Sequence, residues 1–160
     1  LAKNQFMTVS KILVSACLLG DKVRYDGAGK PCLELLSFLK NKDIEVHKLC
    51  PEMLGGLPVP RIPAEIDEPT DKVLNKSGTD VSKQFLLGAE STLKYCQNNG
   101  IKIAVLKSKS PSCGKDRIYD GTFSGRLRDG AGCTARLLMQ NGIDVFDETE
   151  LEKLEIKLKE

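Results

Sequence analysis

Short apolar runs alternate with amphipathic stretches along this chain. Four runs rich in Ile, Leu and Val have the length of buried strands, at residues 11–16, 44–49, 101–106 and 143–146. Apolar residues recur at helical spacing between and after them, over residues 31–40, 80–99, 132–140 and 148–160. Strands that alternate with helices favour a parallel sheet covered on both faces. The pattern therefore predicts a three-layer α/β/α fold with a mostly parallel, Rossmann-like central sheet.

Helix-capping and helix-breaking residues mark several element boundaries. Pro31 suits the first position of a helix, since proline lacks the N–H that this position does not use. Thr79 or Asp80 can cap the long central helix, and Gly100 is its expected stop. Five prolines fall between residues 51 and 69, which predicts an irregular segment there.

The chain is expected to form one domain over residues 11–160, with residues 1–10 as an N-terminal extension. Met7 is a candidate native start within that extension. Residues 118–123 predict a short hairpin or turn.

Composition and charge limit the class of protein. The chain is 41% hydrophobic and 29% charged, which is ordinary for a globular domain. No run approaches the roughly 18 apolar residues of a membrane helix, and residues 1–10 lack the apolar core of a signal peptide. We therefore expect a cytoplasmic protein without a membrane partner. A net charge of +2 neither demands nor forbids a nucleic-acid partner. The absence of Trp, with few other aromatic residues, leaves few platforms on which nucleic-acid bases could stack, which argues against one.

Six cysteines change this picture, because the expected compartment disfavours disulfides and favours metal binding or catalysis. Cys32, Cys96 and Cys133 each lie at helical spacing from apolar neighbours. They are expected to pack as small buried hydrophobes.

The other three cysteines each follow a predicted strand. Cys17 comes after residues 11–16, Cys50 after residues 44–49, and Cys113 lies in the loop after residues 101–106. Because the carboxyl ends of parallel strands meet at one edge of a sheet, these three thiols should converge. Gly- or Pro-rich turns beside each of them can offer backbone N–H groups to thiolate charge. The alternative is three unrelated buried thiols.

Converging thiolates suit zinc or an iron–sulfur cluster. No CxxC pair is present, which disfavours a zinc knuckle, and His47, the only histidine, lies within a predicted strand. Three thiolates around four irons leave one iron without a protein ligand, and that open position can bind substrate.

Six sequence strings point to a known family. They are VSACLLG (14–20), RYDG (24–27), CPEMLGGLPVPR (50–61), PAEI (63–66), SPSCG (110–114) and IYDGTFSG (118–125). Together they resemble the bacterial thiouracil desulfurase family, formerly catalogued as a domain of unknown function, and the likeness runs from about residue 11 to residue 146. It implies a [4Fe–4S] enzyme that removes sulfur from thiolated uracil. The implied ligands are Cys17, Cys50 and Cys113, the same three that strand ends select. Val23 departs from the family, where a cysteine often precedes the RYDG string.

The resemblance also implies catalytic roles. The acid/base carboxylate maps onto Glu52, and the catalytic serine onto Ser110, with Ser112 as its competitor. Iron would polarise the thiocarbonyl while Glu52 activates water, so that oxygen replaces sulfur. Arg24 and Asp26 are candidates to bind substrate or brace the site, and their alternative is a hydrogen-bonded turn.

The expected partner is a small thiolated base or nucleoside, and the sequence leaves the choice among base, nucleoside and RNA open, as it does the oligomeric state. Lys107, Lys109, Lys115 and Arg117 flank Cys113 and either attract an anion or form a solvated face. Gly130 and Gly132 before a helix are a weak phosphate-binding signal. Two rival functions are a metal-bearing module that binds thiolated RNA and a thiol redox protein using Cys17 or Cys113.

Overall fold

The central sheet has four parallel strands. A computed structural model describes residues 9–40 and 42–160. The strands are β1 (Ser10–Ser15), β2 (Ile44–Leu49), β5 (Ile103–Leu106) and β8 (Asp144–Asp147). They lie in the order β2-β1-β5-β8, and every neighbouring pair is parallel. All four were predicted from their apolar runs, with boundaries that differ by two residues or fewer.

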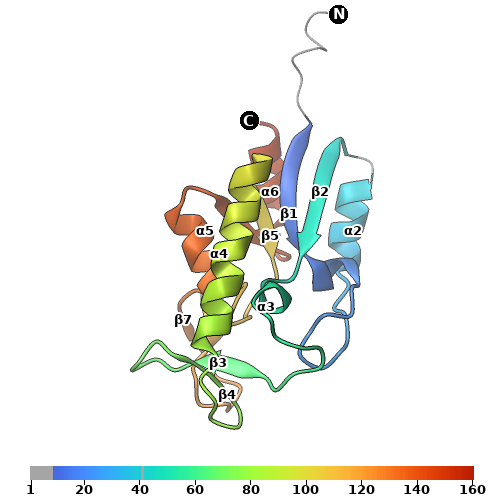
Figure 1. Ribbon diagram of the computed structural model, residues 1–160. Coiled ribbons are helices and arrows are strands. Elements are labelled where there is room, and N and C mark those ends of the chain that lie inside the picture. Colours follow the sequence, from blue (N-terminus) through green and yellow to red (C-terminus); the bar gives the residue numbers. More distant parts are fainter. Residues whose placement is uncertain (1–8, 41) are drawn as a thin grey trace, which may run out of the picture.

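Helices cover both faces of this sheet, as Figure 1 shows. The larger ones are α2 (Leu33–Lys40), α4 (Ser82–Asn99), α5 (Cys133–Gln140) and α6 (Leu151–Leu158). Side chains alternate along β1, so Leu13 packs with the core under α4 and α5. Ile12 and Val14 point the other way, to the core under α2 and α6. The predicted three-layer fold is confirmed.

Two small antiparallel sheets lie beyond the carboxyl ends of the parallel strands (Figure 1). One pairs β3 (Ala64–Ile66) with β4 (Val73–Asn75), and the other pairs β6 (Arg117–Tyr119) with β7 (Leu127–Asp129). A third core cluster joins them to α4. Its buried residues are Ile66, Val73, Val81, Phe85 and Ile118.

The proline-rich segment is more regular than the sequence suggests. Residues 51–69 contain the short helix α3 (Pro51–Leu54) and the strand β3, so the prediction of a wholly irregular segment was wrong. Pro51 occupies the first turn of α3, where no backbone N–H is needed. Pro63 and Pro69 flank β3 and do not interrupt it.

Helix and hairpin boundaries also shift from their predicted places. Helix α4 begins at Ser82, whose N–H is accepted at 2.9 Å by the Asp80 carboxylate, and no side chain caps it at Val81. Gly100 ends it in the left-handed conformation, as predicted. The predicted turn at 118–123 belongs to a wider hairpin, whose second strand is β7.

The proposed N-terminal extension and the candidate start at Met7 lie almost wholly outside the described residues, and β1 already begins at Ser10. Within residues 9–40 and 42–160, no helix is both long and apolar enough to cross a membrane.

Two glycines bring α3 against α4. A Cβ added to Gly55 would lie 1.9 Å from the Gln84 carbonyl oxygen, and one added to Gly88 would lie 2.0 Å from the Pro51 carbonyl oxygen. Both distances are far inside van der Waals contact, so the two backbones can approach this closely only without side chains. This contact fixes the position of α3, which carries Glu52.

Candidate metal centre

Three cysteines far apart in the sequence line one cavity of about 440 Å³. Cys17 lies in the 3-10 helix η1 (Ala16–Leu19) directly after β1, and Cys50 lies between β2 and α3. Cys113 follows β5 in the loop before β6. All three therefore lie at the carboxyl edge of the sheet, where strand-end reasoning places them. Their binding of a metal stays a prediction.

Cys17 and Cys113 are buried, Cys50 is half-buried, and the three thiols influence one another. Burial, followed by the nearby Cys50, raises the pKa of Cys17 to about 11. Burial raises the pKa of Cys113 to about 12, and it also raises the pKa of Cys50. A redox nucleophile needs a lowered pKa and an accessible sulfur. The thiol redox alternative is therefore disfavoured for Cys17 and Cys113.

Polar donors lie near the sulfur atoms of Cys113 and Cys50. Ser15 Oγ lies 3.4 Å from Cys113 Sγ, and Ser112 Oγ lies 3.6 Å from it. The Arg61 guanidinium lies 4.0 Å from Cys50 Sγ. Donors directed at sulfur stabilise negative charge on a thiolate, which is the form that binds metal.

A single metal ion and a cluster require different arrangements of their ligands. Within the described part of the chain, no three His, Cys, Asp or Glu side chains are grouped closely enough to hold a single metal ion. A tetrahedral zinc ion with bonds of about 2.3 Å would need such a group. A four-iron cluster takes each thiolate on a different iron, so its ligands lie further apart. Three cysteines around one cavity are ligands of the kind that an iron–sulfur cluster takes.

His47 lies apart from this cavity, in agreement with its placement in a predicted strand. Its Nδ1 lies 2.6 Å from the Tyr95 hydroxyl and its Nε2 lies 2.5 Å from the Glu45 carboxylate.

Glu52 is held from two sides at the cavity. Its Oε1 accepts a hydrogen bond from Arg61 Nε at 2.9 Å, and its Oε2 accepts one from the Ser112 hydroxyl at 2.7 Å. The carboxylate is only 14% exposed and the Arg61 side chain 7%. Arg61 was not among the predicted site residues, although it ends the string CPEMLGGLPVPR.

Arg61 ties several segments of the site together. Its Nη1 donates to the Pro58 carbonyl at 3.1 Å, and its Nη2 donates to the Val23 carbonyl at 2.9 Å. One guanidinium therefore links the RYDG region, α3 and the proline-rich loop. The fork of donors in arginine suits this arrangement, which a single ammonium cannot reproduce.

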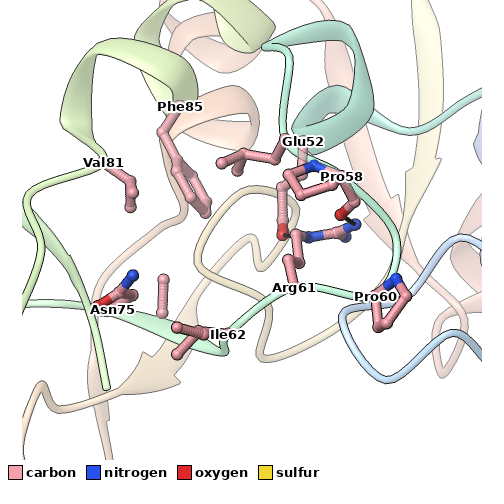
Figure 2. A pocket seen from close by; sticks show the side chains of 10 residues that line it. Glu52, Pro58, Pro60, Arg61, Ile62, Asn75, Val81 and Phe85 are labelled. Atoms are coloured by element: carbon pink, nitrogen blue, oxygen red, sulfur yellow. Dashed lines mark hydrogen bonds and ion pairs between the residues drawn. The ribbon is translucent and has the colours of Figure 1, made fainter. Parts of the chain in front are cut away.

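A second, mostly apolar cavity of about 300 Å³ adjoins this pair (Figure 2). Glu52 and Arg61 line both cavities. Figure 2 shows this pair on one side of the smaller cavity, with Val81 and Phe85 on the other. The ion pair thus forms part of the wall between the two spaces.

The two candidate serines have different contacts. Ser112 is buried and its hydroxyl donates to Glu52. Ser110 Oγ accepts the N–H groups of Ser112 and Cys113 at 3.1 and 3.0 Å, which holds the turn that presents Cys113. The two hydroxyl oxygens lie 3.0 Å apart, so Ser110 can donate in turn to Ser112.

The RYDG string forms a hydrogen-bonded turn. Asp26 Oδ1 accepts the Ala28 N–H at 3.0 Å, and Gly27 adopts a φ of +79°. Arg24 lines the main cavity, whereas Asp26 does not. Contact of Arg24 with substrate stays a prediction, and Asp26 fits the turn alternative.

Most basic residues near Cys113 are already paired. Lys107 binds Glu148 at 3.1 Å, Lys115 binds Glu150 at 2.9 Å, and Arg117 lies 3.6 Å from Asp129. Lys109 lines the main cavity. These ion pairs disfavour an anion site, and Lys107 and Lys115 are too little exposed to form the solvated face that was the alternative.

Backbone carbonyl groups of the protein occupy the N-terminus of α5, where a phosphate would bind. The N–H groups of Cys133 and Thr134 donate to the carbonyls of Pro111 and Ser112, each at 2.9 Å. A Cβ on Gly132 would lie 2.6 Å from the Ser112 backbone, so this glycine permits close packing. The phosphate-binding interpretation of the Gly130 and Gly132 pair was wrong, because the loop before Cys113 occupies the helix N-terminus.

The remaining cysteines pack as expected. Cys96 is fully buried, and Cys32 and Cys133 are partly buried against core clusters.

Comparisons with known proteins point in one direction. Residues 12–150 match the family described as 2-thiouracil desulfurase. "Uncharacterized protein YbbK" of Bacillus subtilis (strain 168) is 40% identical over 151 residues, which cover 89% of this chain and 99% of that protein. A solved structure described as a [4Fe-4S]-dependent thiouracil desulfidase, TudS (DUF523Vcz), is similar with a TM-score of 0.85 and 45% identity. That match covers 94% of this chain and 98% of the other.

Proposed function

This chain belongs to the 2-thiouracil desulfurase family, and on that premise we propose that it is a [4Fe–4S]-dependent desulfurase. It replaces the thiocarbonyl sulfur of a thiolated uracil with oxygen, and a solved relative of 45% identity is described as a [4Fe-4S]-dependent thiouracil desulfidase. The observation that carries the proposal is the convergence of three cysteines, two buried and one half-buried, and Glu52 on one cavity.

Cys17, Cys50 and Cys113 would hold the cluster. The burial of Cys17 and Cys113, the position of all three cysteines around one cavity, and the donors near the sulfurs of Cys50 and Cys113 support this assignment. When bound, such a cluster supplies an iron without a protein ligand, which acts as a Lewis acid toward sulfur. Val23, where relatives often have cysteine, is not needed, because three thiolates suffice.

Glu52 would act as the general base toward water. Its carboxylate lines the same cavity as the three cysteines and is oriented by Arg61 and Ser112. Ser110 would meet the substrate, and its hydroxyl can pass a proton through Ser112 to Glu52, since the two steps span 3.0 and 2.7 Å. Arg61 would hold the carboxylate in a fixed orientation.

The net reaction consumes one water and releases hydrogen sulfide. Water gives its oxygen to the ring carbon and its two protons leave with the sulfur, so no electron donor is required. The residues of this chain therefore need to bind the ring, hold the attacking water and carry a proton.

Anaerobic reconstitution with iron and sulfide, followed by 2-thiouracil, tests the proposal. We expect about four irons per chain, broad visible absorbance, and release of uracil and sulfide. Cys17→Ala, Cys50→Ala and Cys113→Ala should each lose iron and activity, whereas Cys96→Ala should keep both. A reconstituted protein that takes up no iron would refute the proposal.

Substrate size is tested in the same assay. We expect a thiolated base or nucleoside to react, and parallel reactions with thiolated RNA would reveal the RNA alternative. All six cysteines are free, which suits a reducing compartment, and we propose a cytoplasmic location.

A further inference from the structure

We propose that Phe123 is a substrate-recognition residue whose ring stacks on the thiolated pyrimidine, and that Glu65 is the positioning residue that holds it there. The inference rests on the proposed function. It concerns the β6–β7 hairpin, which none of the catalytic assignments uses.

Phe123 occupies an unfavourable backbone conformation at the main cavity. Within the described part of the chain, only three residues other than glycine have positive φ: Asp71 at 60°, Lys109 at 68° and Phe123 at 56°. Lys109 and Phe123 both line the cavity that contains the three cysteines, and Asp71 does not. A bulky aromatic residue rarely adopts this conformation, and such strain persists where surrounding contacts impose it, often at functional sites.

Glu65 supplies those contacts. Its Oε1 accepts the N–H groups of Gly121 and Phe123 at 3.0 and 3.1 Å. A Cβ on Gly121 would lie 2.8 Å from the Ile66 carbonyl oxygen, so the loop is seated closely on β3. One carboxylate and one close backbone contact thus fix the loop that presents Phe123.

The loop is also braced internally. Thr122 Oγ1 lies 2.5 Å from Asp120 Oδ1 and 2.6 Å from Ser124 Oγ. Phe123 is only partly buried and belongs to none of the three core clusters found among the described residues. Its ring is therefore not explained by packing of the fold.

The chemistry of the proposed substrate suits an aromatic side chain such as Phe123 in the cavity. A thiolated pyrimidine is flat and offers polar atoms only at its edge. Glu52, Ser110 and Ser112 supply polar groups to the cavity, and Phe123 can supply an apolar face. Stacking of a base on an aromatic side chain is favourable for any pyrimidine, whichever ring position carries sulfur.

The experiment compares Phe123→Gly and Phe123→Tyr in the reconstituted enzyme. Glycine removes the ring but adopts positive φ freely. We expect KM for 2-thiouracil and Kd for uracil to rise about tenfold in Phe123→Gly, the scale of losing one base–aromatic stack. The kcat should stay within about twofold because the catalytic groups are untouched. The melting temperature should be equal or higher because the strain is relieved. Phe123→Tyr keeps the ring and should bind like wild type.

Asp71→Gly is the matched control. It relieves the same kind of backbone strain outside the cavity, so KM and Kd should not change. An unchanged Kd in Phe123→Gly would overturn the inference, and so would an equal rise in Asp71→Gly. If wild-type protein binds uracil but fails to desulfurise 2-thiouracil, the proposed function fails while the Kd comparison still tests Phe123.

A double-mutant cycle tests the role of Glu65. Glu65→Ala should weaken uracil binding in the wild-type background and have little further effect in Phe123→Gly, because Glu65 acts through the ring. Additive losses in the double variant would refute the positioning role.

Discussion

At the residue scale, Arg61 contacts several separate groups of the site. Its guanidinium contacts the Glu52 carboxylate, two backbone carbonyls and the sulfur of Cys50. The side chains of Arg61 and Glu52 are only 7% and 14% exposed, so water has little access to this ion pair. The proposed base therefore depends on Arg61 for its orientation.

We predict that Arg61→Met lowers kcat about 10- to 100-fold, since a small misplacement of a catalytic group can cost this much. Iron content after reconstitution should be unchanged, because all three thiols remain. Added guanidinium should restore part of the activity, because it can bind beside Glu52 in the smaller cavity that Arg61 lines. Steady-state kinetics and an iron assay measure these effects.

Arg136→Met is the matched control for this variant. Arg136 forms an ion pair of the same length, 2.9 Å, with Asp71, but both side chains are well exposed and neither lines a cavity at the site. Its kcat should match wild type. Equal losses in the two variants would show that Arg61 is only structural.

Glu148 links stability to pH. Burial raises the pKa of this carboxyl, but hydrogen bonds from Ser108 and the charge of Lys107 outweigh it, so the pKa lies below its usual 4.5. A lowered folded-state pKa adds stability above the unfolded pKa, and this stability is lost as pH falls through the folded value. Glu148→Gln should therefore lose less stability between about pH 6 and about pH 3 than wild type.

Urea unfolding at the two pH values measures this difference. The exposed Glu68→Gln serves as control and should keep the wild-type pH dependence. A Glu148→Gln protein whose stability falls as steeply as that of wild type would contradict the prediction.

At the element scale, the contact between α3 and α4 positions the proposed base. Gly88 lies in the middle of α4, where glycine is intrinsically unfavourable by about 1 kcal/mol relative to alanine. Its presence is explained by the Pro51 carbonyl of α3, which an added Cβ would meet at 2.0 Å. For Gly88→Ala, helix propensity therefore predicts a gain in stability, whereas tertiary packing predicts a loss.

We predict that Gly88→Ala destabilises the protein by about 1–3 kcal/mol, because overpacking outweighs the gain in helix propensity. It should also lower kcat, since α3 carries Glu52. Urea unfolding and kinetics measure both effects. Glu90→Ala, on the exposed side of α4, should stay within about 0.5 kcal/mol of wild type. A stabilised Gly88→Ala would show that α3 moves freely.

At the scale of the whole molecule, the candidate ligands join separate parts of the fold. Cys17, Cys50 and Cys113 follow β1, β2 and β5, three neighbouring strands of the sheet. A group bound to all three would connect these strand ends in the folded state only. Ligand binding that is specific to the folded state raises its stability.

We predict that the reconstituted protein melts at a higher temperature than the metal-free protein, by several degrees, as expected for a gain of about 2–3 kcal/mol. Anaerobic calorimetry measures the shift, and an iron chelator should reverse it. Cys113→Ala should abolish the difference, and Cys133→Ala should retain it. Equal melting temperatures with and without iron would contradict a shared site.

Much of this architecture could be predicted from local sequence. The four sheet strands are continuous apolar runs, and their alternation with helices specifies parallel pairing. The same reasoning placed three cysteines at one edge of the sheet. It failed for β3 and α3, because the prolines there flank or begin the elements, which composition alone does not distinguish from interruption.

The sequence by itself determined the fold class, the sorting of the six cysteines and the family, because these depend on periodicity and on motifs read along the chain. Only the tertiary structure decided that Arg61 holds Glu52, that Ser112 and not Ser110 contacts that carboxylate, and that Phe123 is held at the cavity by Glu65. These contacts join residues that lie 9, 60 and 58 positions apart. Which side chains meet in these contacts depends on how the helices, strands and loops pack together, and no local pattern in the sequence predicts that packing.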